Sequence, residues 1–417
     1  MKITRVESFL MSYPLPEPLK MRFYGGERTI FKRDAMLIRI QTDNGLVGYA
    51  PGQGSEKADR AIREVIAPFL EGRTLADTDA LRVLFLQGPG RDPHLAKTFC
   101  SVEIALHDLI GKALGAPVSE LLGGRVRDRI RLYGSAGMYM EPEGYAEEAA
   151  AVAEMGFSAY KMRPALGPDQ DVRTVELMRR AVGPDMELMV DAHAWWRMGD
   201  LSYSLETVEQ VAEGMASHRI FWLEEPWLPD DHATYRRLKE KGLVPLASGE
   251  HEQGEDSFLD LIQTQCVDYV QMDLVCQGGY PMGRMILTEA AREGIHFAFH
   301  SWGTALELVA AAHLGVCWPE IVAEWLEYPC YSGFDRRGMY PFPLAEDILA
   351  EPLEIEKGEL IVPRGAGLGV SVNESVIERY PWIPGPWTCF TLKSPPETRY
   401  ISSDHSVKWE GKAQAGE

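Results

Sequence analysis

From about residue 129 to residue 345, short apolar runs alternate with segments that carry apolar residues at helical spacing. The runs are RIRLYGSAG, SAYKMR, ELMVDAH, IFWLEEP, VPLASGEH, DYVQMD, IHFAFHS and IVAEWLE. They are nearly continuous in apolar character, which is typical of parallel strands with both faces buried. Eight strands with seven intervening helices predict an α/β fold with a TIM-like (β/α)7β barrel over residues 128–345.

The segments on either side of the barrel have a different rhythm. Residues 1–127 mix strand and helix patterns, including a hairpin at the Asn44-Gly45 turn, and predict a separate α+β domain. The glycine-bearing segment MRFYGGERT (21–29) is interpreted as a mobile loop. Residues 346–417 are rich in proline, glycine and aromatic residues, and we expect them to pack back on the first domain and complete it. The terminal stretch KWEGKAQAGE is predicted to be disordered.

Composition narrows the classes of partner. A length of 417 residues with 45% hydrophobic residues is enough for two globular domains. The formal net charge of −20 argues against a nucleic-acid partner and against contact with anionic membranes, because both need a basic face. No apolar run approaches the ~20 residues that span a bilayer, and the start of the chain is not typical of a secretory signal. The six cysteines lack CxxC spacing, which favours reduced thiols and a cytoplasmic protein.

Three of the apolar runs end in carboxylates, namely Asp191, Glu224 and Glu250. Because the carboxyl ends of parallel strands meet at one rim of a barrel, we expect these side chains to lie close together. Two carboxylates about 4 Å apart repel by about 4 kcal/mol at an effective dielectric of about 20, so a cation has to offset the repulsion. Hard oxygen ligands favour Mg²⁺ over zinc, and the sequence therefore predicts a magnesium site.

Further polar residues fall at the same strand ends: Lys161, Arg163, His193, Asp273, His300 and Glu327. Each has an ordinary alternative when it is taken alone. A Lys-x-Arg pair is more often solvated, His300 could be an unremarkable core or surface histidine, and Asp273 could cap the following loop. Polar residues at seven of the eight strand ends nevertheless favour a catalytic rim.

The order Lys-x-Arg, Asp-x-His, Glu-Glu-Pro and Gly-Glu-His, followed by Asp273 and His300, resembles the enolase superfamily. Within it, the chain is similar to the mandelate racemase subgroup, and particularly to its acid-sugar dehydratases. Glu250 follows Glu224 by 26 residues and His300 follows Asp273 by 27, which agrees with the family spacing. The resemblance covers roughly residues 1–380. It implies a first domain that closes over the barrel as a capping domain, and a symmetric homo-oligomer.

The resemblance also implies a role for each residue at the rim. Mg²⁺ held by the three carboxylates would bind the carboxylate of a small-molecule substrate, a sugar acid. His300 would take the proton α to that carboxylate, while Asp273 holds the imidazole ring. Lys161 and a protonated Glu327 would stabilise the dianion that forms. We choose Glu327 over Glu324 because strand alternation should leave it nearer the rim.

Two departures from the family pattern decide the predicted reaction. Arg163 stands where many relatives have a second lysine, and arginine, with a pKa above about 12, is a poor base. A racemase needs a base on both faces of the α-carbon, so Arg163 argues against racemisation. His193 stands where some relatives have asparagine, and it could protonate a departing 3-hydroxyl. The prediction is a dehydratase of an aldonic or aldaric acid that forms a 2-keto-3-deoxy sugar acid.

Substrate contacts and rival functions are left open by the sequence. We expect Arg22, Tyr24 and Arg28 to meet the distal end of the substrate, where cations would favour a second carboxylate; a solvent-exposed loop is an equal alternative. Trp302 could wall the pocket or simply pack against helices. A racemase, epimerase or cycloisomerase on the same scaffold is the first rival function, and a binding protein that has lost catalysis is the second.

Overall fold

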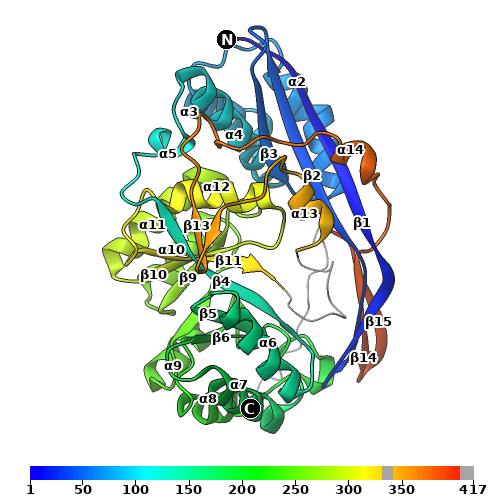
Figure 1. The fold of residues 1–417 in the computed structure, drawn as a ribbon, viewed down its shortest axis with the longest axis vertical. Coiled ribbons are helices and arrows are strands. Elements are labelled where there is room, and N and C mark those ends of the chain that lie inside the picture. The colour runs from blue at the N-terminus through cyan, green and yellow to red at the C-terminus, as the bar shows by residue number, and fades with distance from the viewer. Residues whose placement is uncertain (331–340, 404–417) are drawn as a thin grey trace.

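The computed structural model describes residues 1–330 and 341–403. An antiparallel sheet with its helices forms one part of the molecule, and a barrel of parallel strands with its helices forms the other (Figure 1). Both parts of the predicted fold class are therefore confirmed. The predicted disordered end, KWEGKAQAGE, lies outside the described residues.

The barrel is a closed ring of parallel strands. In ring order they are β4 (Arg129–Met138), β5 (Ala159–Arg163), β6 (Glu187–Asp191), β7 (Trp222–Glu224), β8 (Leu246–Ser248), β9 (Tyr269–Asp273), β10 (His296–His300) and β11 (Ala323–Pro329). β11 pairs with β4 and closes the ring. The connecting helices are α6 (Pro142–Glu154), α7 (Pro168–Val182), α8 (Leu205–Ala216), α9 (His232–Lys241), α10 (Glu255–Gln263), α11 (Gly279–Glu293) and α12 (Ala305–Gly315). None of the helices in residues 1–330 and 341–403 combines the length and apolar character that a membrane span requires.

One side chain from each barrel strand contributes to a packed cluster inside the ring. The cluster consists of Tyr133, Ala159, Met189, Trp222, Ala247, Tyr269, Ala298 and Trp325. Alanines lie between the large rings, so that the rings of Trp222 and Tyr269, for example, can pack at a centroid distance of 5.1 Å. The barrel interior is thus a core rather than a pore, and polar side chains are left at the strand ends.

The first domain is built on an antiparallel sheet. Its strands are β1 (Ile3–Phe23), β2 (Gly26–Thr42), β3 (Val47–Gly52), β14 (Thr388–Lys393) and β15 (Pro396–Ile401). Its helices are α1 (Glu56–Ala61), α2 (Ala67–Leu70), α3 (Thr78–Gln87), α4 (Pro93–Leu114) and α5 (Val118–Leu121). The hairpin predicted at Asn44-Gly45 is present, and it joins β2 to β3.

The segment MRFYGGERT is not the loop that its glycines led us to expect. β1 and β2 remain paired as far as Phe23 and Gly26, so only a tight turn separates them. On its other side β2 pairs with β14, and Leu392 lies opposite Gly26. A Cβ at Gly26 would lie 2.0 Å from the Thr391 carbonyl oxygen, so the glycine permits close approach of two strands here.

The C-terminal residues return to both parts of the molecule. After α13 (Pro343–Asp347), β12 (Ile355–Glu356) and β13 (Glu359–Ile361) form a hairpin, and β13 pairs antiparallel with β4. After α14 (Val376–Arg379), β14 pairs with β2 and so joins the N-terminal sheet. The described C-terminal residues therefore extend the barrel sheet as well as the first sheet.

Candidate active site

The residues predicted for the metal and the base lie at the carboxyl ends of the barrel strands. Asp191 and Glu224 are the last residues of β6 and β7 and are register partners in the ladder. Asp273 and His300 are the last residues of β9 and β10 and are also register partners. Glu250 follows the end of β8 by two residues. Because each polar residue comes where its buried strand ends, these side chains share one rim of the barrel.

Lys161 on β5 lies among the carboxylates of this rim. Its Nζ is 2.8 Å from Glu224 Oε1 and 3.0 Å from Glu327 Oε1. It is also 3.7 Å from Asp191 Oδ2. Burial opposes the charge, but Glu224 and Glu327 outweigh it and raise the pKa of Lys161 well above its usual range. Lys161 is therefore a permanent cation that can act as a hydrogen-bond donor, and it is not a base in this arrangement.

Arg163, two residues further along β5, is held on several sides. Its Nη1 donates to the Ala136 carbonyl oxygen and its Nη2 donates to Ser135 Oγ, both at 3.1 Å. Its Nη2 also lies 3.2 Å from Glu327 Oε1. The guanidinium carbon lies 4.1 Å from the centroid of a Trp302 ring, which places this predicted substrate-binding residue at the rim. Arginine keeps its proton at neutral pH, so Arg163 is a fixed cation.

His300 and Asp273 form a hydrogen-bonded pair. His300 Nδ1 lies 2.9 Å from Asp273 Oδ2, while its Nε2 lies 3.0 Å from Glu250 Oε2. Asp273 is held in turn by the Cys276 backbone N–H, which donates to Oδ1 at 2.7 Å. Burial opposes the imidazolium, but Glu250 and Glu327, together with the bond to Asp273, raise the pKa of His300 well above its usual range. Asp273 fixes one ring nitrogen and leaves Nε2 directed towards the carboxylates.

His193 lies beside Asp191 on the loop after β6. Its Nδ1 is 2.7 Å from Asp191 Oδ1, and its backbone N–H donates to the same oxygen at 3.3 Å. Burial lowers the pKa of His193 to about 4, against the opposing effect of Asp191. The imidazole is therefore neutral at pH 7 in this arrangement.

The structure separates Glu327 from Glu324. Glu327 is fully buried between the cations of the rim, whereas Glu324 lies 3.5 Å from Arg131 Nη1 and accepts from the Tyr269 hydroxyl at 2.9 Å, near the amino ends of the strands. Burial opposes ionisation of Glu327, but Lys161, with His300 and the arginine, holds its pKa below the usual range. The cations around this carboxylate therefore favour its ionised form, and the role of Glu327 as a protonated donor stays a prediction.

The residues of the rim fit a divalent cation. Burial, with the nearby anions Asp191 and Glu250, raises the pKa of Glu224 to about 8 despite its contact with Lys161. Asp191 Oδ2 is buried, and its cationic neighbours are Arg163 Nε at 3.1 Å and Lys161 Nζ at 3.7 Å. A cation that prefers oxygen ligands would favour ionisation of Glu224 and would use the lone pair of Asp191. The assignment of Asp191, Glu224 and Glu250 as the residues that would hold Mg²⁺ stays a prediction.

Three residues beside the predicted ligands were missed from the sequence. Glu225 Oε2 lies 2.7 Å from His251 Nδ1, and His251 Nε2 lies 2.5 Å from Arg197 Nη2. Within residues 1–330 and 341–403, the trio whose ligand atoms lie within 4.8 Å of one another is Glu225, Glu250 and His251, rather than the predicted trio. Burial raises the pKa of Glu225 and, with Arg197, lowers that of His251 to about 4.

Glu225 and His251 could have been found from the sequence, because they belong to the Glu-Glu-Pro and Gly-Glu-His motifs that contain the predicted ligands. In a regular strand, neighbouring side chains lie on opposite faces, so Glu225 would not share the rim with Glu224. The backbone of Glu225 has φ of 42°, however, so the strand pattern does not continue through this residue.

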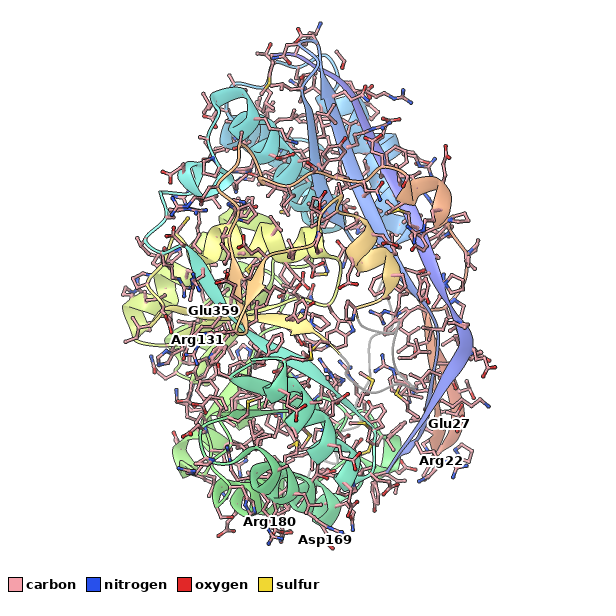
Figure 2. All side chains as sticks on the ribbon, viewed as in Figure 1. Arg22, Glu27, Arg131, Asp169, Arg180 and Glu359 are labelled. Carbon is pink, nitrogen blue, oxygen red and sulfur yellow. The ribbon has the colours of Figure 1, made fainter. Side chains whose placement is uncertain are left out.

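The predicted substrate-binding residues of the first domain are placed unevenly. Arg22 is exposed and lies opposite Glu27 in the β1–β2 ladder, at the outer edge of the molecule (Figure 2). Tyr24 is 40% exposed in the hairpin turn. Arg28 is buried, and its Nη1 contacts Met138 Sδ at 3.2 Å, at the carboxyl end of β4. Arg28, rather than Arg22, thus reaches the end of a barrel strand.

Two family comparisons cover most of the chain. Residues 6–123 match the N-terminal domain of the mandelate racemase / muconate lactonizing enzyme family, and residues 144–376 match the enolase C-terminal domain-like family. The chain belongs to the enolase superfamily. Its expected place in the mandelate racemase subgroup is confirmed by the match of the N-terminal domain.

Characterised relatives in the superfamily carry out more than one reaction. A D-galactarolactone cycloisomerase from Agrobacterium fabrum is 29% identical over 91% of this chain and 99% of its own length. A D-xylonate dehydratase from Haloferax volcanii is 28% identical over 83% of this chain and 85% of its own. The structure of a 3,6-anhydro-D-galactonate cycloisomerase from Zobellia galactanivorans has a TM-score of 0.77 at 28% identity, over 91% of this chain and 99% of that one.

Proposed function

We propose that this protein is a Mg²⁺-dependent dehydratase of a sugar acid, either aldonic or aldaric. The proton α to the carboxylate is removed, and the 3-hydroxyl leaves as water. The enol that remains tautomerises to a 2-keto-3-deoxy sugar acid. The partner is then a small carboxylate rather than nucleic acid or a membrane, and we expect a cytoplasmic homo-oligomer.

The surroundings of Arg163 carry this proposal. Racemisation through a carbanion needs a base on each face of the α-carbon, whereas elimination needs one base and one acid. Arg163 donates to Ser135 and to the Ala136 carbonyl oxygen, and it is paired with Glu327, so it is a positioned cation rather than a base. A single imidazole base, His300, then favours elimination.

The neighbouring residues fit the charge that develops during proton removal. Glu250 is the carboxylate that most raises the pKa of His300, so a cation that offsets the charge of Glu250 would favour the neutral imidazole. The neutral imidazole then receives the C2 proton at Nε2, because its Nδ1 is bonded to Asp273. The substrate carboxylate then carries a second negative charge. Lys161 is a buried cation that can donate to this charge, and Glu327 holds Lys161 and Arg163 in place. Mg²⁺, when bound, supplies Lewis-acid stabilisation of the same carboxylate.

Departure of the hydroxyl requires a proton on the C3 oxygen. The C3–O bond breaks as the enolate electrons form the C2–C3 double bond, and the oxygen leaves as water. His300 can be the donor, because it then holds the abstracted proton. His193 beside Asp191 is the other candidate, and it would serve only after it is protonated, because burial keeps it neutral in the arrangement described above. Relatives named D-gluconate dehydratase and arabinonate dehydratase, at 26% and 27% identity, support loss of water from a sugar acid.

A cycloisomerase is the second candidate, because two similar proteins carry that name. If the C3 oxygen of the substrate belongs to a ring, as the name 3,6-anhydro-D-galactonate implies, the same proton removal opens the ring and nothing leaves. The two candidates therefore share the base and the cations, and they differ in whether the leaving oxygen is free or tied into the substrate.

A panel of open-chain sugar acids and their lactones, incubated with Mg²⁺ in D₂O, tests the proposal. We expect a 2-keto-3-deoxy product from an open-chain acid, and loss of deuterium exchange at C2 in His300→Asn. Product from cyclic substrates alone would support the cycloisomerase, and inversion at C2 without a keto product would support an epimerase. Exchange at the wild-type rate in His300→Asn would remove His300 as the base, and full dehydration by His193→Asn would remove His193 as the acid.

A further inference from the structure

A chain of contacts next to the predicted metal ligands has no role in the reaction described above. It runs from Arg197 to His251 and from His251 to Glu225 and Glu250. Arg197 Nη2 lies 2.5 Å from His251 Nε2, and His251 Nδ1 lies 2.7 Å from Glu225 Oε2 and 3.3 Å from Glu250 Oε1. The side chain of Glu225 is fully buried, and that of Glu250 is 10% exposed.

The contact with Arg197 decides which nitrogen of His251 carries the proton. A guanidinium group has donors and no acceptor, so a short contact to Nε2 requires that Nε2 accept. In a neutral imidazole the other nitrogen then carries the hydrogen, and His251 Nδ1 donates to Glu225. A protonated nitrogen has no lone pair for a metal ion.

The position of Arg197 is set by the loop after β6. Its guanidinium carbon lies 4.3 Å from the centroid of a Trp196 ring, and Trp196 Nε1 donates to the Glu225 carbonyl oxygen at 3.0 Å. This bond joins the loop to the residue with φ of 42° after β7. The loop and the ends of β7 and β8 are therefore connected through side chains.

We propose that Arg197 sets the metal selectivity of the site. By donating to His251 Nε2, it keeps the proton on Nδ1 and so withdraws the imidazole from the trio Glu225, Glu250 and His251. Carboxylate oxygens are left as ligands, and they favour Mg²⁺ over Ni²⁺, whereas an available imidazole favours Ni²⁺. This inference rests on the Mg²⁺ site of the proposed function.

The test compares the binding of Mg²⁺ and Ni²⁺ by calorimetry to the full-length wild type and to Arg197→Met, which has no donor. We expect the ratio of Ni²⁺ to Mg²⁺ affinity to rise by about tenfold or more in Arg197→Met, as outer-shell partners of metal ligands typically matter by that factor. Arg197→Lys keeps a donor and is expected to keep a ratio near that of the wild type. The double variant Arg197→Met/His251→Gln lacks the imidazole and should lose the increase.

Copper binding provides a direct signature of the ligand. His300 lies 3.0 Å from Glu250 and is retained in all variants, so the informative quantity is the change in the number of coupled nitrogens. Arg197→Met loaded with Cu²⁺ should show one more coupled nitrogen than the wild type in its electron paramagnetic resonance spectrum, and the double variant should lose that addition. An unchanged affinity ratio in Arg197→Met, or an equal rise in the double variant, would overturn this inference while the proposed function stands. A wild type that binds no Mg²⁺ would overturn the proposed function and this inference together.

Discussion

At the scale of single residues, the chemistry of the rim depends on which side chains can release or accept a proton. Asp273 is bonded to Nδ1 of His300, so Nε2 is the nitrogen that can exchange a proton with the substrate. Lys161, in contrast, is held in its charged form by Glu224 and Glu327. Arg163 is charged by its own nature. Cations and the single base are thus assigned by hydrogen bonds rather than by residue type alone.

Arg163→Lys tests whether the several simultaneous hydrogen bonds of the guanidinium group are needed. A lysine cannot reach Ser135, the Ala136 carbonyl oxygen and Glu327 together, so the positioned charge is displaced. We expect kcat for dehydration to fall by about 100-fold, the typical result of a displacement of about 1 Å at a reacting site. Steady-state kinetics with the substrate from the panel measures it.

A matched change at the surface provides the control for Arg163→Lys. Arg173 pairs with Glu143 at 2.7 Å with both side chains more than half exposed, so Arg173→Lys should leave kcat unchanged. Wild-type kcat in Arg163→Lys would contradict the fixed-cation role. Appearance of C2 epimerisation in this variant would instead show that a lysine at this position acts as a second base.

At the scale of the elements, close backbone approach fixes where the ligands stand. Gly249 lies between the end of β8 and Glu250 with φ of 140°, and a Cβ there would lie 2.1 Å from the Gln271 carbonyl oxygen on β9. Only glycine fits a position that needs both this φ and this contact. Gly249→Ala should therefore lower the free energy of unfolding by about 1–3 kcal/mol or more and displace Glu250.

Urea unfolding of Gly249→Ala and Gly254→Ala separates the effect of positive φ from the effect of the contact with Gln271. Gly254 also has positive φ, 85°, but a Cβ there would meet nothing within 4 Å. The loss of stability in Gly254→Ala should therefore be the smaller of the two, and Mg²⁺ affinity should fall only in Gly249→Ala. Equal losses in both variants would show that the contact with Gln271 has no effect of its own.

Helix α12 contains a buried histidine that makes stability depend on pH. His313 Nε2 lies 3.0 Å from the Leu368 carbonyl oxygen, and the Ser119 backbone N–H donates to Nδ1 at 3.3 Å, so the ring is neutral. Burial lowers the pKa of His313 to about 4. The pKa of His313 is lower in the folded than in the unfolded chain. Its contribution to the free energy of unfolding is therefore present above about pH 6.5 and is lost as the pH falls towards 4.

Between about pH 6.5 and pH 4, the free energy of unfolding should fall by roughly 3 kcal/mol because of His313. Urea unfolding across this range should show a smaller dependence on pH in His313→Gln than in the wild type. His218→Gln, at a partly buried position, is the control and should keep the wild-type slope. Identical slopes for the wild type and His313→Gln would contradict the prediction.

At the scale of the whole molecule, an ion bound at the predicted site would link the ends of β6, β7 and β8. Ions that bind the folded state alone add about 2.7 kcal/mol at 100 times their dissociation constant. Mg²⁺ should therefore raise the Tm of the wild type, and chelation should lower it again. Asp191→Asn removes a charged ligand and should lose most of the increase in a thermal melt. A wild-type Tm that does not respond to Mg²⁺ would argue against the site.

The barrel and the polar residues at its rim were predictable because their signals are local. A buried strand is a short apolar run, and its last residue stands at a rim that all the parallel strands share. Asp191, Glu224, Asp273 and His300 could thus be assigned to one end of the barrel before any distance was known. The choice between Glu324 and Glu327 also followed from the position of each residue along its strand.

Only the tertiary structure decided which residues support that rim. The partnership of Arg197 with His251 joins loops that follow different strands, and Glu225 enters it through a backbone angle that interrupts strand alternation. In the same way, the β1–β2 hairpin stays extended because β14, from the far end of the chain, pairs with β2. Periodicity records how a residue relates to its neighbours in sequence. It contains no signal for contacts between distant segments, which form only when the chain folds.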